Sequence, residues 1–473
     1  MAENQDPQES QPQPEAPGPR RSRYATAAVI VAVVVSLLTT AQPVFDPGTQ
    51  DFYADSPDSV RIADMAARVT LREALGWWHG QWIQQTPYYR PLASWVIWVE
   101  YLVTGGSFAG LCAASWLLHG LNGALLCLLA LRLLGDRRPA WLWAVLAVGL
   151  FNFRLGPAGP SWHPWPVAIG VVAWWPAQTD QLSLAAALGC LIFLDRYLAG
   201  RGRRDLVAAY VLYAVALLCK EMAVCVPLVG ALLLVYRRAK GQWHIPLAWA
   251  GMAAVLLVIR RLAVPDAMDP ALADFYPQHV ARKLLWYSLE RLWSYLDPTG
   301  PREYWLVVAA WGTMAALYLL WRLRLSIVWM ILAALLLPGI VAQVMRGNFA
   351  LVTIPRDLYG LCTVFMASLG LLALVRLGTR QAWLLLGMVV AVHVPIIHVI
   401  GPHYWYWPAA FWGLFSACLL SLAAGRMAEV AGKPPFAAAR PHGTQDAPPD
   451  GPVDGADVPG GGPEAPDEAP PRP

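Results

Sequence analysis

Apolar and polar positions follow one another in long blocks along this chain. Between residues 24 and 425, stretches of roughly 15 to 25 mostly apolar residues are separated by polar junctions that carry most of the charges. A helix needs about 20 apolar residues to cross the hydrocarbon core of a bilayer. The pattern therefore predicts an all-α polytopic membrane protein with about twelve transmembrane helices.

The predicted spans share a nearly continuous apolar sequence. They cover residues 24–41, 108–134, 139–153, 180–198, 205–219, 222–236, 245–264, 303–321, 325–344, 357–376, 382–399 and 405–424. Two long segments interrupt this succession, a first loop at 42–107 and a second at 265–302. The membrane domain is thus expected to cover residues 24–425, with the tails 1–23 and 426–473 on either side.

Two further stretches are apolar but do not have the pattern of a span. The Trp- and Tyr-rich stretch 88–104 contains Arg90 and Glu100, so it predicts a helix on the membrane surface within the first loop. The stretch 165–177 is interrupted by two prolines and predicts a re-entrant or surface segment.

Composition agrees with a membrane protein and excludes other classes. Charged residues make up only 14% of the chain and hydrophobic residues 57%, whereas soluble domains carry about 25% charge. We therefore do not expect the chain to fold into soluble domains, and we do not expect it to bind nucleic acid. The 24 Trp residues suit aromatic belts at the two membrane interfaces.

The distribution of basic residues predicts the orientation. About 19 of the 35 Lys and Arg residues lie at alternate junctions, which are short enough for the positive-inside rule to apply. These junctions are 20–23, 132–138, 196–204, 237–240, 322–324, 376–380 and 426–433. Both termini are then cytoplasmic and both long loops lie outside the cell (inner) membrane. The two tails are rich in Pro and polar residues and are expected to be disordered.

The seven cysteines lie in or beside apolar runs and form no CxxC pair, so neither a disulfide framework nor a cysteine metal site is expected. The first loop, in contrast, gathers carboxylates. They are Asp46, Asp51, Asp55, Asp58 and Asp64. A carboxylate just above the membrane can act as a general base or as a ligand of a divalent cation. Solvated loop acids are the alternative interpretation, and the sequence leaves the metal open.

Lys220 and Glu221 interrupt an otherwise apolar stretch, ALLCKEMAVCVP, at the predicted outer surface. Ionisable residues in such surroundings are functional candidates, and an ammonium group there can hold a phosphate. A mutual ion pair that caps a short turn is the alternative. In the junction before residue 180, His163 and Asp180 are the titratable groups. Asp180 is equally interpreted as a helix N-cap, and His163 as an interfacial residue.

His119 and Asn122 lie three residues apart in the span 108–134 and therefore share one helix face. They are candidates for function or for hydrogen bonds between helices. Arg356 and Tyr359 stand at the outer end of the span 357–376, where the arginine can bind a phosphate or extend to the membrane interface. No phosphate-binding glycine loop is present, which disfavours a nucleotide-driven pump.

Six motifs appear in an order that resembles a known class of membrane enzymes. They are FYADSPD at 52–58, YYRPLASW at 88–95, LLHGLNGALL at 117–126, VAWWPAQTDQLSLAAAL at 172–188, LLCKEMAVCVPL at 217–228 and PRDLYGLCTVF at 355–365. In this respect the chain resembles the GT-C class of multi-spanning glycosyltransferases. The closest likeness is to the bacterial relatives of the transmembrane and tetratricopeptide-repeat O-mannosyltransferases, although no tetratricopeptide repeats follow the last span.

The resemblance implies a GT-C-like fold with surface helices in the first outer loop. It also implies transfer of a sugar, with inversion, from a polyprenyl-phosphate carrier to a protein, lipid or glycan acceptor outside the membrane. The implied catalytic base is one of Asp55, Asp58 and Asp51. We expect the donor to be bound by Lys220, Glu221, Arg356, Tyr359, Asp180, His163, Tyr89, Arg90 and His119. A multi-spanning transporter and a polysaccharide ligase or polymerase are the alternatives.

Overall fold

The computed structural model describes residues 19–46, 54–84, 88–135, 139–152, 167–264, 379–396 and 402–430. The second predicted loop and the three predicted spans between residues 303 and 376 lie outside this part of the chain. The described residues form helices and short turns without a strand. The all-α prediction is therefore confirmed for the part of the chain that can be described.

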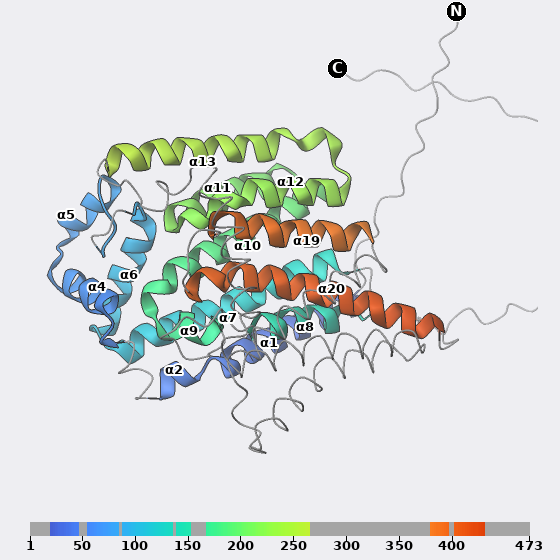
Figure 1. Cartoon of the computed structure of the whole chain (residues 1–473), viewed down its shortest axis with the longest axis horizontal. Coiled ribbons are helices and arrows are strands. Elements are labelled where there is room, and N and C mark those ends of the chain that lie inside the picture. Colours follow the sequence, from blue (N-terminus) through green and yellow to red (C-terminus); the bar gives the residue numbers. More distant parts are fainter. Residues whose placement is uncertain are drawn as a thin grey trace, which may run out of the picture.

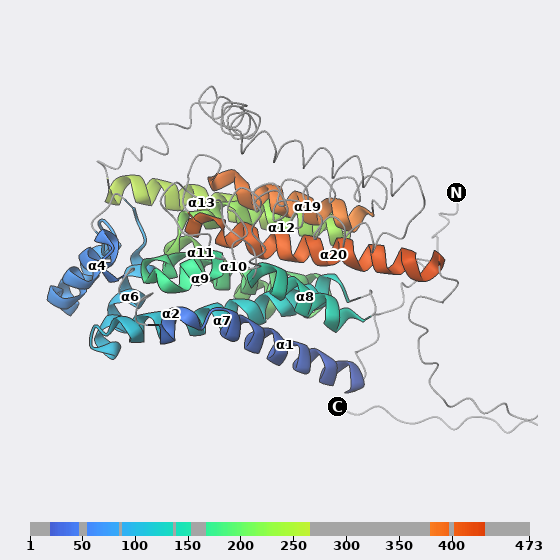
Figure 2. The same cartoon turned by 60° about the horizontal axis from the view of Figure 1, so that its bottom comes forward.

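The predicted spans that fall within the described residues correspond to helices that run side by side (Figures 1 and 2). These are α1 (Pro19–Thr39), α7 (Phe108–Leu133), α8 (Ala140–Asn152), α10 (Gln178–Leu198), α11 (Arg203–Cys219), α12 (Val226–Arg237), α13 (His244–Ala263), α19 (Arg380–His393) and α20 (Tyr406–Val430). Helix α12 begins later than predicted because a 3-10 segment, Glu221–Cys225, precedes it. Helix α19 ends earlier than predicted and is followed by a 3-10 turn that contains Pro395.

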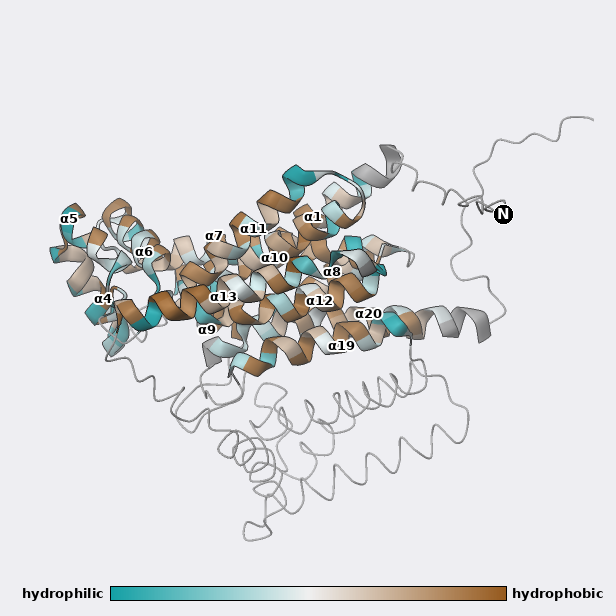
Figure 3. Cartoon of the chain, turned by 90° about the horizontal axis from the view of Figure 1, so that it is seen from above, coloured by the Kyte–Doolittle hydropathy of each residue, from teal (hydrophilic) through white to brown (hydrophobic). Residues whose placement is uncertain are grey.

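Four helical segments of the described chain are long and apolar enough to cross a membrane. They are Phe108–Leu133, Trp175–Leu198, His244–Ala263 and Tyr406–Gly425. Large apolar side chains of α13 point outward, and Leu247 and Leu262 are 70% and 76% exposed. Figure 3 shows hydrophobic colouring along much of the bundle and hydrophilic colouring at several helix ends. A surface of this kind is more stable in lipid than in water, and it indicates that the chain associates with a membrane.

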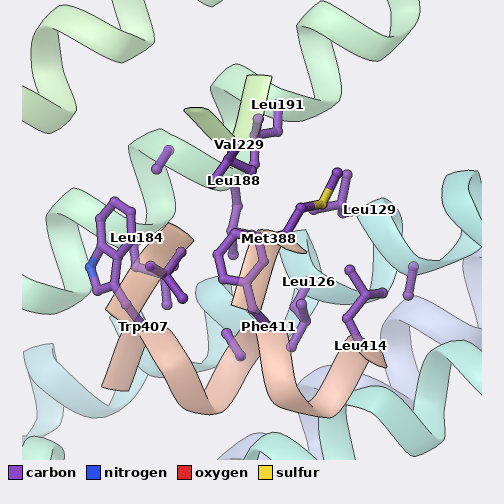
Figure 4. Packing of buried hydrophobic residues seen from close by; sticks show 14 of the residues in the cluster. Leu126, Leu129, Leu184, Leu188, Leu191, Val229, Met388, Trp407, Phe411 and Leu414 are labelled. Atoms are coloured by element: carbon purple, nitrogen blue, oxygen red, sulfur yellow. The ribbon is translucent and has the colours of Figure 1, made fainter. Parts of the chain in front are cut away.

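Helix α10 lies at the centre of the bundle, and most of its residues are buried. Figure 4 shows the apolar side chains that fill the space between α10 and its neighbours. They come from α7 (Leu126, Leu129), α10 (Leu184, Leu188, Leu191), α12 (Val229), α19 (Met388) and α20 (Trp407, Phe411, Leu414). Helices α8 and α20 approach closely at Gly413, where a Cβ atom would clash with the carbonyl oxygen of Ala147.

The two ends of the bundle differ in composition. At one end the first loop forms α4 (Pro57–Arg68), α5 (Leu71–Ala74) and α6 (Pro91–Thr104), which gather beside one another in Figure 1; we call it the loop end. The other end carries basic residues of the short junctions, and we call it the arginine end. From α1 to α13, successive long helices of the bundle run in alternate directions between these ends (Figures 1 and 2).

Helix α6 has the two faces expected of a helix at a surface. Ala93 and Ile97 are fully buried against the rest of the loop end, whereas Leu102 and Val103 are more than half exposed. The described part of the stretch 165–177, from residue 167 on, forms the short helix α9 (Val167–Ala173) and a 3-10 turn. Most of their residues are buried, so this stretch packs against the rest of the protein.

Candidate functional site

Four of the predicted donor-binding residues meet at the loop end, although they come from distant parts of the sequence. Arg90 precedes α6, Asp180 lies in the first turn of α10, and Lys220 and Glu221 stand between α11 and α12. Helices α10 and α11 pack side by side, and α6 lies against both. The fold thus brings two cations and two carboxylates together where these elements begin or end.

The break between α11 and α12 directs Lys220 and Glu221 to different partners. Lys220 has extended backbone (φ −160°, ψ 146°), and the 3-10 segment starts at the next residue. Successive side chains of an extended backbone point to opposite sides. The Lys220 ammonium contacts the carboxylate of Asp180, whereas the Glu221 carboxylate contacts Arg90. The alternative of an ion pair between Lys220 and Glu221 is therefore wrong.

The pair of Lys220 and Asp180 is almost fully enclosed. The two side chains are 2% and 0% exposed, and the Lys220 Nζ donates a hydrogen bond to Asp180 Oδ2. The ring of Tyr404 lies 4.5 Å from the same Nζ, a cation–π contact. Asp180 does not cap its helix, because α10 begins at Gln178 and its N-cap residue is Ala177. The N-cap interpretation of Asp180 is thus wrong.

The second pair joins Arg90 to Glu221. The Nε and Nη2 atoms of Arg90 lie 3.0 and 2.7 Å from Oε2 of Glu221. Arg260, in the last turn of α13, approaches the other carboxylate oxygen at 3.8 Å. The Arg90 guanidinium also stacks on the rings of Tyr88 and Trp82, at 4.2 and 5.0 Å. Its planar shape suits both contacts, which a lysine could not make together.

We call Arg90, Asp180, Lys220, Glu221 and Arg260 the loop-end cluster. Its three cations face two carboxylates, which leaves one positive charge in excess. The side chains of Arg90 and Arg260 are only 6% and 10% exposed, whereas Glu221 is 25% exposed. An excess charge in surroundings of low polarity attracts an anion. Glu221 is the member through which the cluster reaches the surface.

Several polar atoms beside the cluster have no hydrogen-bond partner among the described residues. The Oδ1 atom of Asp180 and both amide atoms of Gln181 are buried without a hydrogen bond to any described part of the chain. The two residues are 0% exposed. Buried polar atoms normally have a protein, water or ligand partner. The first turn of α10 therefore offers donors and acceptors for a polar ligand or for ordered water.

The first-loop carboxylates lie in two different environments. Asp55 is exposed in the turn before α4, whereas Asp58 is half-buried in the first turn of α4. The Gln84 amide donates to Asp58 Oδ1. Burial raises the pKa of the Asp58 carboxyl above its usual range, and Arg61 and Gln84 oppose this rise. A half-buried carboxylate with a raised pKa has the character of a general base.

Trp82 and Gln84 connect Asp58 with the surroundings of Arg90. The backbone N–H of Trp82 donates to the carbonyl of Tyr88 at 3.0 Å, and both of these rings face Arg90. Asp58 thus contacts Gln84, which lies two residues after Trp82, and the ring of Trp82 lies against Arg90.

The structure places two other predicted residues away from the ion pairs. The Tyr89 hydroxyl donates to the carbonyl of Trp78 at 3.2 Å. His119 is fully buried between helices: its Nδ1 lies 2.7 Å from the Tyr406 hydroxyl and its Nε2 lies 2.8 Å from Asn152 Oδ1. Because the amide oxygen can only accept, Nε2 carries the hydrogen and Nδ1 accepts from Tyr406. Both ring nitrogens of His119 thus bind neighbouring helices, as its structural interpretation expects.

Four predicted site residues, Asp51, His163, Arg356 and Tyr359, lie outside the described residues. Three members of the site were missed from the sequence, namely Tyr88, Arg260 and Tyr404. Arg260 carried a usable signal, because it stands in an apolar helix that ends at the predicted outer surface. Tyr88 lies beside Arg90 in YYRPLASW, whereas nothing near Tyr404 indicated that it lies against Lys220.

Metal binding was left open by the sequence. Within the described ranges, no three His, Cys, Asp or Glu side chains come together as a metal site would require. The six cysteines that the structure describes are buried and form no disulfide with one another.

The chain was compared with protein-family models, with curated proteins and with solved structures, and none of the three comparisons gives a match.

Proposed function

We propose that this protein is a membrane glycosyltransferase of the GT-C type. It moves a sugar from a polyprenyl-phosphate carrier to an acceptor on the outer face of the cell membrane. In this proposal the chain has about twelve spans and both termini are cytoplasmic. The observation that carries it is the loop-end cluster, an excess positive charge enclosed at one end of an apolar helix bundle.

The chemistry of such a donor explains why this arrangement supports the proposal. The polyprenyl chain stays in the bilayer while the sugar and its phosphate lie at the membrane surface. An enzyme for this substrate needs apolar helices for the lipid, cations for the phosphate and a carboxylate above them. The helices of the bundle, the Arg90, Lys220 and Arg260 side chains, and Asp58 supply these three elements near one end of the bundle.

In the proposed step, a first-loop carboxylate removes the proton of an acceptor hydroxyl. The oxygen attacks the anomeric carbon from the face opposite the phosphate, and the bond between this carbon and the phosphate oxygen breaks. The phosphate leaves with the electron pair, and the anomeric centre is inverted. Arg90, Lys220 and Arg260 stabilise the charge that grows on the leaving phosphate.

Asp58 is the favoured base among the three candidates. It is half-buried, has a raised pKa and contacts Gln84 near the Arg90 environment, whereas Asp55 is exposed. Asp51 remains a candidate outside the described residues. The polar atoms of Asp180 and Gln181 that have no partner in the described structure are available for sugar hydroxyls.

An in-vitro transfer assay with a panel of short-chain polyprenyl-phosphate sugars tests the proposal. Release of free sugar to water serves as a readout that needs no acceptor. We expect turnover by the full chain, and a loss of about 100-fold or more in Asp58→Asn, in line with general-base catalysis. Arg72→Gln, in the exposed part of the first loop, is the matched control. If Asp55→Asn, Asp51→Asn and Asp58→Asn each keep full activity, the base assignment is wrong.

A transporter is the second candidate, and the enclosed pair of Lys220 and Asp180 favours it. Buried ion pairs at helix breaks are also found in ion-coupled transporters, and α11 and α12 are separated by such a break. In a transporter, however, these groups lie near mid-membrane, whereas here they lie at helix ends. Substrate-driven proton uptake in proteoliposomes, without any sugar transfer, would favour the transporter over the enzyme.

A further inference from the structure

A second group of charges lies at the arginine end and is not used by the proposed reaction. Asp195, near the end of α10, is 0% exposed. Its Oδ2 accepts from Nε of Arg132 at 2.5 Å, and its Oδ1 accepts from Nε of Arg237 at 2.6 Å. Nη2 of Arg237 also donates to the carbonyl of Arg132 at 2.9 Å. One carboxylate therefore fixes two guanidinium groups from α7 and α12 next to each other.

A third arginine reaches the same helix end. Nη2 of Arg380, the first residue of α19, donates to the carbonyl of Val235 at 2.6 Å, two residues before Arg237. We call Arg132, Asp195, Arg237 and Arg380 the arginine-end cluster. It contains three positive charges and one negative charge, an excess of two.

The arginines of this cluster are accessible. The side chains of Arg132 and Arg237 are 28% and 32% exposed, and Arg380 is exposed. A guanidinium has five N–H donors in one plane, and Asp195 takes one of them from Arg132 and one from Arg237. Two guanidinium groups held in a fixed arrangement match the geometry of a phosphate, whose oxygens accept several such hydrogen bonds.

Exposed tryptophans place this end at the depth of lipid head groups. Trp383 lies three residues after Arg380 on α19, so both share one helix face, and it is 47% exposed. Trp243, next to the start of α13 at the same end, is 45% exposed. Exposed Trp side chains are typical of the membrane interface, where the lipid phosphates also lie.

We propose that the arginine-end cluster binds the phosphate group of an anionic phospholipid. Asp195 positions Arg132 and Arg237 for the phosphate, Arg380 adds a third cation, and Trp383 lies along the lipid below the head group. Basic pockets between the ends of membrane helices are a known setting for anionic head groups. The site needs neither the loop-end cluster nor any step of the sugar transfer.

Native mass spectrometry of the full chain in detergent tests this proposal. The probes are phosphatidylglycerol, phosphatidylethanolamine and inorganic phosphate. We expect phosphatidylglycerol to be retained in preference to phosphatidylethanolamine, and millimolar inorganic phosphate not to displace it. Arg380→Gln should weaken phosphatidylglycerol binding about fivefold, the effect of one arginine near a membrane surface. If inorganic phosphate displaces the lipid completely, the ligand is free phosphate and the lipid assignment is wrong.

Asp195→Asn separates a built site from a general attraction between charges. This variant makes the protein more positive, but it releases Arg132 and Arg237 from their shared anchor. The proposal predicts weaker phosphatidylglycerol binding, by about fivefold or more. Stronger or unchanged binding would show that only net charge matters and would overturn the proposal.

A matched control removes three other exposed arginines of the same end, with Arg201→Gln, Arg203→Gln and Arg204→Gln combined. We expect this variant to keep the lipid selectivity, whereas Arg132→Gln with Arg237→Gln loses it. If Asp195→Asn does not fold, as judged by its helix content, the Arg380→Gln variant still tests the proposal, because the Arg380 hydrogen bond goes to the carbonyl of Val235 and not to Asp195. Equal losses in Arg380→Gln and in the control would contradict the proposal.

Discussion

The loop-end cluster and the arginine-end cluster use the same chemical groups in opposite ways. At the loop end, each carboxylate has its own main partner, and the cation side chains are 2–10% exposed. At the arginine end, one carboxylate serves two arginines whose side chains are about a third exposed. Aromatic rings also lie against Lys220 and Arg90 at the loop end. The charged side chains of the loop-end cluster are thus mostly buried, whereas the arginines of the arginine-end cluster are partly exposed at the surface.

This difference in exposure determines how much each cluster lowers the stability of the folded protein and which ligands it can bind. An enclosed ion pair must be balanced by its own partners or by a ligand, because the surrounding groups cannot solvate it. An exposed cluster is balanced by water, salt or head groups at little cost. The loop end is therefore suited to a specific anionic substrate, whereas the arginine end is suited to the lipids of the membrane.

The largest effect is expected from breaking the pair of Lys220 and Asp180. Lys220→Met leaves the Asp180 carboxylate buried without its partner, which should cost about 3–5 kcal/mol of unfolding free energy. The double variant Lys220→Met with Asp180→Leu should recover most of this loss, because a whole buried pair can be replaced by apolar side chains. Denaturant titrations of the wild type and of these two variants measure both effects. A loss below about 1 kcal/mol in the single variant would show that the pair is not enclosed.

A smaller effect is expected from Arg90→Lys, which keeps the charge. The lysine cannot offer two nitrogens to Glu221 while it stacks on Tyr88, so we expect a loss of about 1–2 kcal/mol in unfolding free energy. Arg68→Lys is the control, because Arg68 pairs with Asp64 at 76% and 47% side-chain exposure. It should change the unfolding free energy by less than about 0.5 kcal/mol. Equal losses of unfolding free energy in the two variants would show that the guanidinium of Arg90 makes no contact that a lysine cannot replace.

The dependence of stability on salt concentration also distinguishes the two clusters. Asp195→Asn should cost about 1 kcal/mol at low ionic strength, because its arginine partners are partly solvated and can turn to water. This loss should shrink when NaCl is raised to about 1 M, where exposed charges are screened within about 3 Å. The loss in Lys220→Met should be unchanged by the same salt. A salt-independent loss in Asp195→Asn would show that the arginine end is as enclosed as the loop end.

The smallest effect concerns the pH dependence of Asp58. Its pKa is raised by burial, so the folded protein prefers the protonated carboxyl, and this contribution to stability is lost as the pH rises through the folded pKa. Asp58→Asn keeps an acceptor for Gln84 without the charge. It should therefore raise the unfolding free energy at pH 7 by less than about 1 kcal/mol, and by less still near pH 4. Melting curves at both pH values test this, and a destabilised variant at pH 7 contradicts it.

The sequence predicted the helices well because long apolar blocks have few alternatives in a membrane. The spans at 108–134 and 180–198 agree with α7 and α10 within two residues at each end. The site was partly predictable, because Arg90, Asp180, Lys220 and Glu221 stand out as polar residues in apolar surroundings.

The pairing of these residues could not be predicted from the sequence. Lys220 and Glu221 are neighbours in the chain, yet the extended backbone of Lys220 sends them to different partners. The role of His119 likewise depends on Asn152 and Tyr406, which only the packing of three helices brings to its ring. Local patterns identify unusual residues, and tertiary packing decides which of them meet.

Binding of a polyprenyl phosphate to the purified chain tests the central claim most directly. The account predicts that native mass spectrometry detects a bound polyprenyl phosphate in the wild type and in Arg380→Gln, and that Arg90→Gln weakens this binding about tenfold or more through loss of a charge-assisted contact. Equal binding by Arg90→Gln and Arg380→Gln, or no binding by the wild type, would contradict the assignment of the loop-end cluster as the site for the lipid phosphate.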